Sequence, residues 1–157
     1  MLTVRKATAE DADRVADLLK AKYSFATVTE AGAAFAYERT HHHFRVADED
    51  GHLLGLISWQ PQGTVKHGVM EVTRFAVLKD APNPTVVKEE LFDASIAEAE
   101  LFYESQGTRL RKVFSMIHAE NKHLQAFFAN KGMRQEAVLK DHFHFGQDEL
   151  VFSMFLG

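Results

Sequence analysis

Glu71 is a residue of this sequence that could carry proton transfer. It lies in an apolar, strand-like segment, and a carboxylate held in such surroundings can act as a general base. A structural role is the alternative, with Glu71 exposed at an edge or paired with Arg74 or Lys66. The residue type and its position leave both interpretations open.

Histidine is the second residue type that could carry chemistry, because the chain has nine histidines and no cysteine. Consecutive residues do not share one face of a helix or strand, so the run 41–43 rarely forms a compact ligand set. His142 and His144 do share a strand face, but no third ligand accompanies them in the sequence. We therefore predict no metal site.

Composition narrows the class of protein. The chain has 157 residues and a net charge of −4, which gives no basic footprint for nucleic acid. No apolar run approaches the roughly 20 residues that a membrane span needs, and the first residues lack the apolar core of a signal peptide. We therefore expect one cytoplasmic domain over residues 1–157, with neither a nucleic-acid nor a membrane partner.

Hydrophobic periodicity gives the elements that would position Glu71. Period-two patterns predict strands and period-3.6 patterns predict helices. The strands are expected at 2–6, 43–48, 52–60, 69–78, 111–118, 134–145 and 149–156, and the helices at 8–23, 29–40, 85–106 and 121–131. We expect Thr29 to cap the second helix and Pro61 to end the third strand. The order β-α-α-β-β-β-α-β-α-β-β predicts an α+β fold, a mixed sheet with helices on both faces.

This order and three sequence stretches resemble the GNAT superfamily of N-acetyltransferases over nearly the whole chain. Residues 3–11 (TVRKATAED) are similar to the family's first strand and acidic helix start. Residues 121–133 (NKHLQAFFANKGM) are similar to its N-x-x-A-x-x-F-Y-x-x-x-G-F helix, and the terminal hairpin with Asp148 also fits. The resemblance implies the GNAT fold and acetyl transfer from acetyl-CoA to a primary amine, of a small molecule or a peptide. It also leaves a homodimer open.

The phosphate loop departs from the family pattern Q/R-x-x-G-x-G/A. Ungapped alignment places this loop on residues 82–87, so that Pro82 replaces the polar first residue while Thr85 and Val87 replace the two glycines. Proline has no N–H to donate to a phosphate, and Lys88 is the one cation nearby. A simpler interpretation is a rigid helix entry with Thr85 as its N-cap.

The site residues implied by the resemblance follow from matching positions. Glu71 would be the base, and the Val77 N–H would donate to the thioester oxygen. Phe128 replaces the family's usual tyrosine acid, which leaves His118 as the alternative donor nearest in sequence, although a surface or packing role suits this histidine better. Asn121 could contact the cofactor or only cap its helix. The acetyl-CoA-binding set would comprise Phe75, Ala76, Val77, Thr85, Val86, Val87, Lys88, Asn121 and Phe128.

Two classes of function therefore remain open from the sequence. The first is an acetyl-CoA-dependent N-acetyltransferase that binds the pyrophosphate of the cofactor more weakly than the family pattern does. The second is a GNAT-fold binding or regulatory domain that has lost catalysis. An acyltransferase that uses another acyl carrier is a third possibility.

Overall fold

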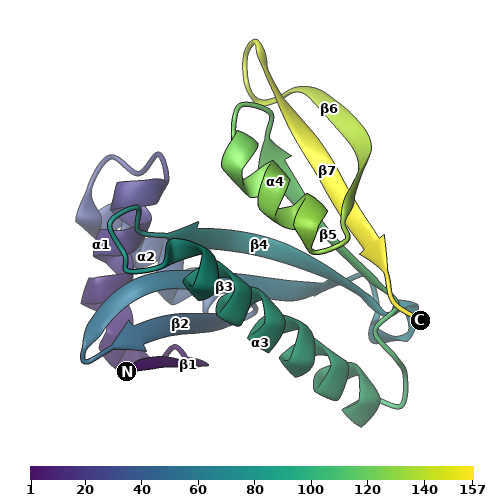
Figure 1. The fold of residues 1–157 in the computed structure, drawn as a ribbon, viewed down its shortest axis with the longest axis horizontal. Coiled ribbons are helices and arrows are strands. Elements are labelled where there is room, and N and C mark those ends of the chain that lie inside the picture. The colour runs from purple at the N-terminus through teal and green to yellow at the C-terminus, as the bar shows by residue number, and fades with distance from the viewer. The chain divides into compact units, whose positions relative to one another are not determined.

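A computed structural model describes all residues, Met1–Gly157. Seven strands form one mixed sheet in the order β1-β2-β3-β4-β5-β7-β6 (Figure 1). The elements are β1 (Leu2–Lys6), α1 (Ala12–Lys22), α2 (Val28–Glu38), β2 (His43–Glu49), β3 (His52–Gln62), β4 (Val69–Val77), α3 (Pro84–Ser105), β5 (Lys112–His118), α4 (Lys122–Asn130), β6 (Arg134–His144) and β7 (Gln147–Phe155). The predicted α+β class and the predicted order of elements are confirmed.

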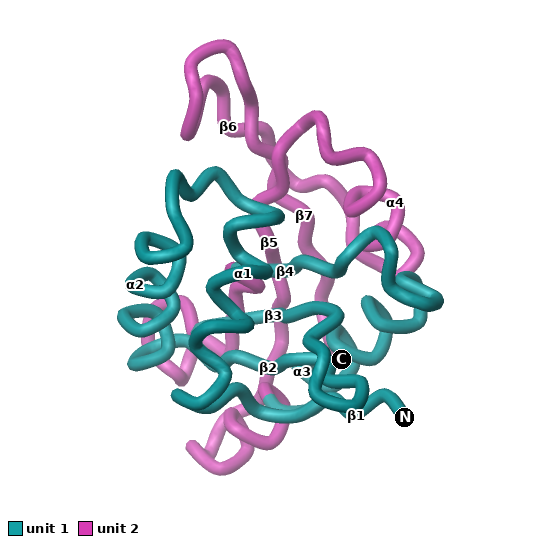
Figure 2. The backbone as a smooth tube through the Cα atoms, turned by 90° about the vertical axis from the view of Figure 1, so that its left-hand side faces the viewer, with its two compact units in different colours: residues 1–60, 74–98 teal, residues 61–73, 99–157 magenta.

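The chain divides into two compact units, coloured separately in Figure 2. Unit 1 comprises residues 1–60 and 74–98, and unit 2 comprises residues 61–73 and 99–157. The division falls within β3, β4 and α3, so each unit holds part of these elements. A single domain over residues 1–157 stays a prediction. None of the helices combines the length and the apolar character needed to cross a membrane.

Several predicted element boundaries are wrong: the first helix becomes α-helical only at Ala12, after a 3-10 turn, and the last strand already begins at Gln147. Three further differences have a local reason. Helix α2 is capped by Thr27, not Thr29, because Thr27 accepts a hydrogen bond from the Glu30 N–H (3.0 Å). Strand β3 continues through Pro61, which lies beyond the last pair of β3 with β2, His43↔Trp59, so β2 has no group there that needs an N–H from position 61. Helix α3 begins at Pro84, so Thr85 is already helical and is not the N-cap; proline favours the first helical position.

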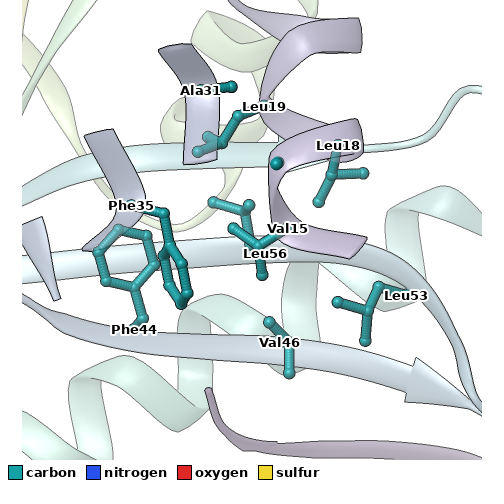
Figure 3. Packing of buried hydrophobic residues seen from close by; sticks show 10 residues of the cluster. Val15, Leu18, Leu19, Ala31, Phe35, Phe44, Val46, Leu53 and Leu56 are labelled. Atoms are coloured by element: carbon teal, nitrogen blue, oxygen red, sulfur yellow. The ribbon is translucent and has the colours of Figure 1, made fainter. Parts of the chain in front are cut away.

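Unit 1 is built on one hydrophobic core. Helices α1 and α2 bury their apolar faces against β2 and β3, as Figure 3 shows. The rings of Phe35 and Phe44 meet edge to face, with centroids 5.1 Å apart. The core residues are Val15, Ala16, Leu18, Leu19, Ala31, Phe35, Phe44, Val46, Leu53 and Leu56. This packing fixes the C-terminal end of α1 over the sheet.

A buried carboxylate joins β1 to the start of α1. Asp11 is 1% exposed and accepts two hydrogen bonds from Arg5 (2.8 and 2.9 Å) and one from Arg14 (2.7 Å). The Thr8 N–H also donates to it, at 2.7 Å. The hydrogen bonds from Arg5 are the largest cause that lowers the pKa of Asp11 from 3.8 to about 2.

We expect Asp11→Asn to lower the free energy of unfolding at pH 7 by about 2 kcal/mol, the value of this pKa shift. Because the folded-state pKa is depressed, the stabilisation is present above pH 3.8 and is lost as the pH falls toward 2. Urea unfolding at pH 7 and at pH 2 measures both values. Exposed Asp13→Asn is the control and should change stability by at most a few tenths of a kcal/mol. An equal loss at both pH values would contradict the assignment.

Unit 2 contains the parallel pair of the sheet. Strand β4 pairs with β5 from Val69↔Lys112 to Val72↔Ser115, and β5 then pairs with β7 in an antiparallel register. The Ser115 hydroxyl donates to the Val72 carbonyl (2.9 Å), and the Tyr103 hydroxyl donates to the Val69 carbonyl (2.6 Å). These bonds hold the start of β4, the part of the strand that carries Glu71.

Candidate active site

The backbone of β4 in unit 1 presents two amides away from β3. The Leu78 N–H donates to the Leu54 carbonyl of β3 (2.9 Å), and the Ala76 carbonyl lies close to Gly55 of the same strand. Backbone groups of successive strand residues point to alternate edges. The N–H groups of Phe75 and Val77 therefore point to the edge opposite β3, which we call the β4 edge.

Gly55 sets the distance between β3 and the β4 edge residues. A Cβ added there would lie 2.8 Å from the Ala76 carbonyl oxygen and 2.9 Å from Val77 Cγ2. Real Cβ atoms do not approach backbone oxygen this closely, so one of the two strands would have to shift. Because Gly55 has no side chain, β4 can lie close beside β3 at Ala76 and Val77.

We expect Gly55→Ala to destabilise the protein by about 1–3 kcal/mol, because the new methyl group overpacks the two strands. It should also displace the β4 edge and weaken whatever that edge binds. Gly32→Ala is the matched control: the nearest atom, Ala16 Cβ, is 3.6 Å away, and alanine favours the α2 helix by about 0.5–1 kcal/mol. Thermal unfolding of both variants provides the measurement, and an unchanged Gly55→Ala midpoint would contradict this description of the strands.

Tyr23 lies at the β4 edge and was not predicted from the sequence. Its hydroxyl oxygen accepts a hydrogen bond from the Phe75 N–H, at 2.8 Å. The Arg74 guanidinium lies 4.7 Å from the centre of the Tyr23 ring and 5.2 Å from that of Phe25. Arg74 is in turn held by two hydrogen bonds to Glu38, at 2.8 and 3.0 Å. The pairing of Arg74 with Glu71 considered from the sequence is therefore wrong, because Arg74 pairs with Glu38.

Positive charge gathers near the start of α3. Burial lowers the pKa of the Lys22 ammonium, and the nearby charges of Lys79 and Lys88 lower it further, whereas Asp80 acts in the opposite direction. We call Lys22, Lys79 and Lys88 the lysine cluster. A helix N-terminus also favours anions through its unpaired N–H groups and its dipole. Unit 1 thus offers an anion two sources of attraction even though the loop lacks glycines.

The four predicted loop positions differ in exposure. Thr85 and Val86 are exposed, Lys88 is partly exposed, and Val87 is 1% exposed. Val87 is therefore a core residue of the first helical turn, and only its backbone could face a ligand. The valine that replaces the second family glycine has a packing role in this chain.

Glu71 is buried in unit 2, with 7% of its surface exposed. The Gln62 side-chain amide donates a hydrogen bond of 2.6 Å to its Oε1. This bond fixes the orientation of the carboxylate. A fixed carboxylate suits a general base, which must lie within hydrogen-bond reach of the proton that it takes.

The remaining predicted residues of unit 2 have structural partners. His118 Nδ1 accepts from the Glu120 N–H (3.1 Å), which assigns the ring proton to Nε2 and directs it to Gln147 Oε1, 2.8 Å away. Asn121 caps α4 by accepting from the Leu124 N–H (3.2 Å). Phe128 is fully buried, at 0% exposure. No group of three or more histidine, aspartate or glutamate side chains could hold a metal ion.

Comparison with known proteins gives fold-level similarity. No protein-family model and no curated protein matches the sequence. Among solved structures, the chain is similar to a Desulfovibrio desulfuricans protein described as a GNAT-family acetyltransferase, with a TM-score of 0.81, 18% identity and 100% of both chains covered. It is similar to the ribosomal-protein-S18-alanine N-acetyltransferase of Escherichia coli, with a TM-score of 0.79, 13% identity, and 100% of this chain and 95% of that chain covered.

A third similar structure is the spermidine/spermine N-acetyltransferase SpeG of Vibrio cholerae, crystallised in mutant forms. Its TM-score is 0.74 and its identity 14%, with 99% of this chain and 95% of that chain covered. All three identities are too low to carry substrate specificity from one chain to the other, so the comparisons concern architecture. The chain has the fold of the GNAT N-acetyltransferases.

Proposed function

We propose that the protein is an N-acetyltransferase that transfers an acetyl group from acetyl-CoA to a primary amine. The β4 edge is the observation that carries this proposal. The N–H groups of Phe75 and Val77 point away from β3 at this edge. These two residues follow the buried Glu71 on the same strand by four and six positions. Strand amides of this kind can bind the amide-rich pantetheine arm and donate to a thioester oxygen.

Unit 1 also contains groups that suit the phosphates of acetyl-CoA. The lysine cluster and the N-terminal amides of α3, including those of Thr85, Val86 and Val87, would hold the pyrophosphate. These groups would take the place of the family's glycine loop, in which the backbone N–H groups approach the pyrophosphate closely. In unit 2, Asn121 and Phe128 of α4 stay predicted cofactor contacts; Asn121 caps the helix, and Phe128 is fully buried.

The chemistry supplied by bound acetyl-CoA is an activated acetyl group. Glu71 would take the proton that the amine loses as it attacks, directly or through water. The Val77 N–H would stabilise the negative charge that develops on the carbonyl oxygen. His118 is a weaker candidate for the acid, because its Nε2 proton is already directed to Gln147.

The acceptor would be a primary amine of a peptide or of a small molecule. The two named structural neighbours act, by their names, on an alanine of a ribosomal protein and on spermidine or spermine. An alanine-initiated peptide and spermidine are therefore the first acceptors to test, and release of the free thiol of coenzyme A reports turnover.

A binding or regulatory domain without catalysis is the second candidate. The loop Pro82-Asn83-Pro84 favours it, because two of its three residues have no N–H to give to a phosphate. A thermal-shift series with acetyl-CoA separates the candidates. Ligand at about 100 times its Kd stabilises by about 2.7 kcal/mol, which raises the melting temperature by about 5–10 °C for a chain of this size. The absence of a shift at millimolar acetyl-CoA would favour the binding domain.

A further inference from the structure

We propose that Tyr23 is the general acid that protonates the leaving thiolate, in place of the tyrosine missing at position 128. This inference rests on the proposed function. It assigns a catalytic proton to a residue of the α1 end, far from α4 in sequence. The geometry of unit 1 carries it.

The position of the Tyr23 hydroxyl is the first argument. It lies 2.8 Å from the Phe75 nitrogen, on the β4 edge where the pantetheine arm is proposed to bind. The chain runs from Phe75 through Val77 to Lys79 and then to Lys88 in the first turns of α3, so the phosphate end of the cofactor would lie past Val77. The acyl end then lies on the Phe75 side, beside Tyr23.

The hydrogen-bonding state of Tyr23 is the second argument. The hydroxyl acts as an acceptor toward the Phe75 N–H, and its own proton is donated to no protein group. When bound acetyl-CoA displaces the Phe75 N–H from the Tyr23 hydroxyl, this hydroxyl can turn its proton toward the sulfur, while the Val77 N–H would hold the carbonyl oxygen. Phe128, by contrast, has no proton to give and is fully buried.

The charges around Tyr23 suit a proton donor. Burial raises the pKa of its hydroxyl, and the charge of Glu38 raises it further, so the group stays protonated across the neutral range; the bond from the Phe75 N–H and the charge of Arg74 act in the opposite direction. The Arg74 guanidinium over the ring stabilises a phenolate formed during the reaction. Glu38 holds Arg74 in that place through two hydrogen bonds.

The step balances in protons and electrons. The amine nitrogen forms a bond to the acetyl carbon and loses a proton to Glu71, and the carbon–sulfur bond then breaks with its electron pair on sulfur. Tyr23 transfers its phenolic proton to that sulfur, which leaves as the free thiol. The Tyr23 phenolate regains a proton from solvent, and the proton on Glu71 passes to solvent.

Tyr23→Phe is the first test, with spermidine and an alanine-initiated peptide as acceptors. We expect kcat to fall about 100-fold, while the Kd of coenzyme A, measured by titration calorimetry, stays within about threefold. Tyr37→Phe is the control, because it also removes one tyrosine hydroxyl, from a ring on α2 that is 63% exposed. It should leave kcat unchanged.

Fluorotyrosine provides a readout that a structural role would not move. The chain has three tyrosines, so incorporation into a Tyr37→Phe/Tyr103→Phe background labels Tyr23 alone. The fluorinated phenol is a stronger acid, and the alkaline limb of the kcat–pH profile should shift to lower pH. The assignment is overturned if the alkaline limb of the fluorotyrosine protein does not shift. It is also overturned if Tyr23→Phe keeps a kcat within threefold of the parent, or if this variant loses affinity for coenzyme A and not kcat. If the parent protein itself neither binds acetyl-CoA nor acetylates an amine, the proposed function fails together with it.

Discussion

Replacing Glu71 with glutamine is expected to lower kcat for amine acetylation about 10²–10⁴-fold, the usual contribution of a general base. Glutamine keeps the size of the side chain and an Oε1 that can still accept the 2.6 Å hydrogen bond from Gln62. It cannot take a proton from the amine. The affinity for acetyl-CoA should therefore stay nearly unchanged, and steady-state kinetics with titration calorimetry measures the two quantities separately.

Glu149→Gln is the matched control for the loss of a buried carboxylate. Glu149 has the same 7% exposure as Glu71 and also lies on a strand of unit 2. Its replacement should leave kcat within about twofold, as a residue outside the reacting groups does. If Glu71→Gln keeps full kcat, or loses acetyl-CoA affinity in place of turnover, Glu71 is not the base.

Removing two charges of the lysine cluster gives the second large effect. We expect Lys22→Met/Lys88→Met to weaken acetyl-CoA binding about 100-fold, because each charge-assisted hydrogen bond to phosphate contributes about 1.5–3 kcal/mol. Methionine retains the apolar stem, so packing should be preserved. The parent protein should lose affinity as salt increases, and the double variant should show a smaller salt dependence.

Lys20→Met/Lys122→Met is the control, because both lysines are exposed and neither belongs to the lysine cluster. It removes the same net charge and should change the Kd by less than about threefold. Equal losses in the two double variants would mean that net charge, not the cluster at the start of α3, attracts the cofactor.

Much of the architecture could be predicted because it depends on local pattern. Asn121 followed by an apolar helical stripe predicts a capped helix, and the structure has that cap. The errors arose where two local signals compete. Thr27 and Thr29 are both of a residue type that favours the N-cap position. Only Thr27 is followed three positions later by a glutamate, Glu30, whose side chain accepts a hydrogen bond from the Ala26 N–H (2.9 Å). Pro84 similarly precedes Thr85 as a helix-starting residue.

The parts of the candidate site that escaped prediction depend on contacts between distant residues. Tyr23 and Phe75 are 52 residues apart, and Arg74 and Glu38 are 36 apart. The lysine cluster draws on the end of α1, the segment after β4 and the first turn of α3. No periodicity along one segment indicates that such residues meet. Only the fold brings them together, which is why the sequence pattern indicates no more than an apolar helix position at Tyr23.

The central claim is that the amides of the β4 edge bind acetyl-CoA, and amide NMR tests it most directly. In a titration of ¹⁵N-labelled protein, we predict that the Phe75 and Val77 resonances move saturably as acetyl-CoA is added, and that Phe75 moves because its N–H leaves the Tyr23 hydroxyl. The Gly32 amide in α2 serves as the reference and should stay in place. Phe75 and Val77 resonances that do not move at millimolar acetyl-CoA would contradict the account.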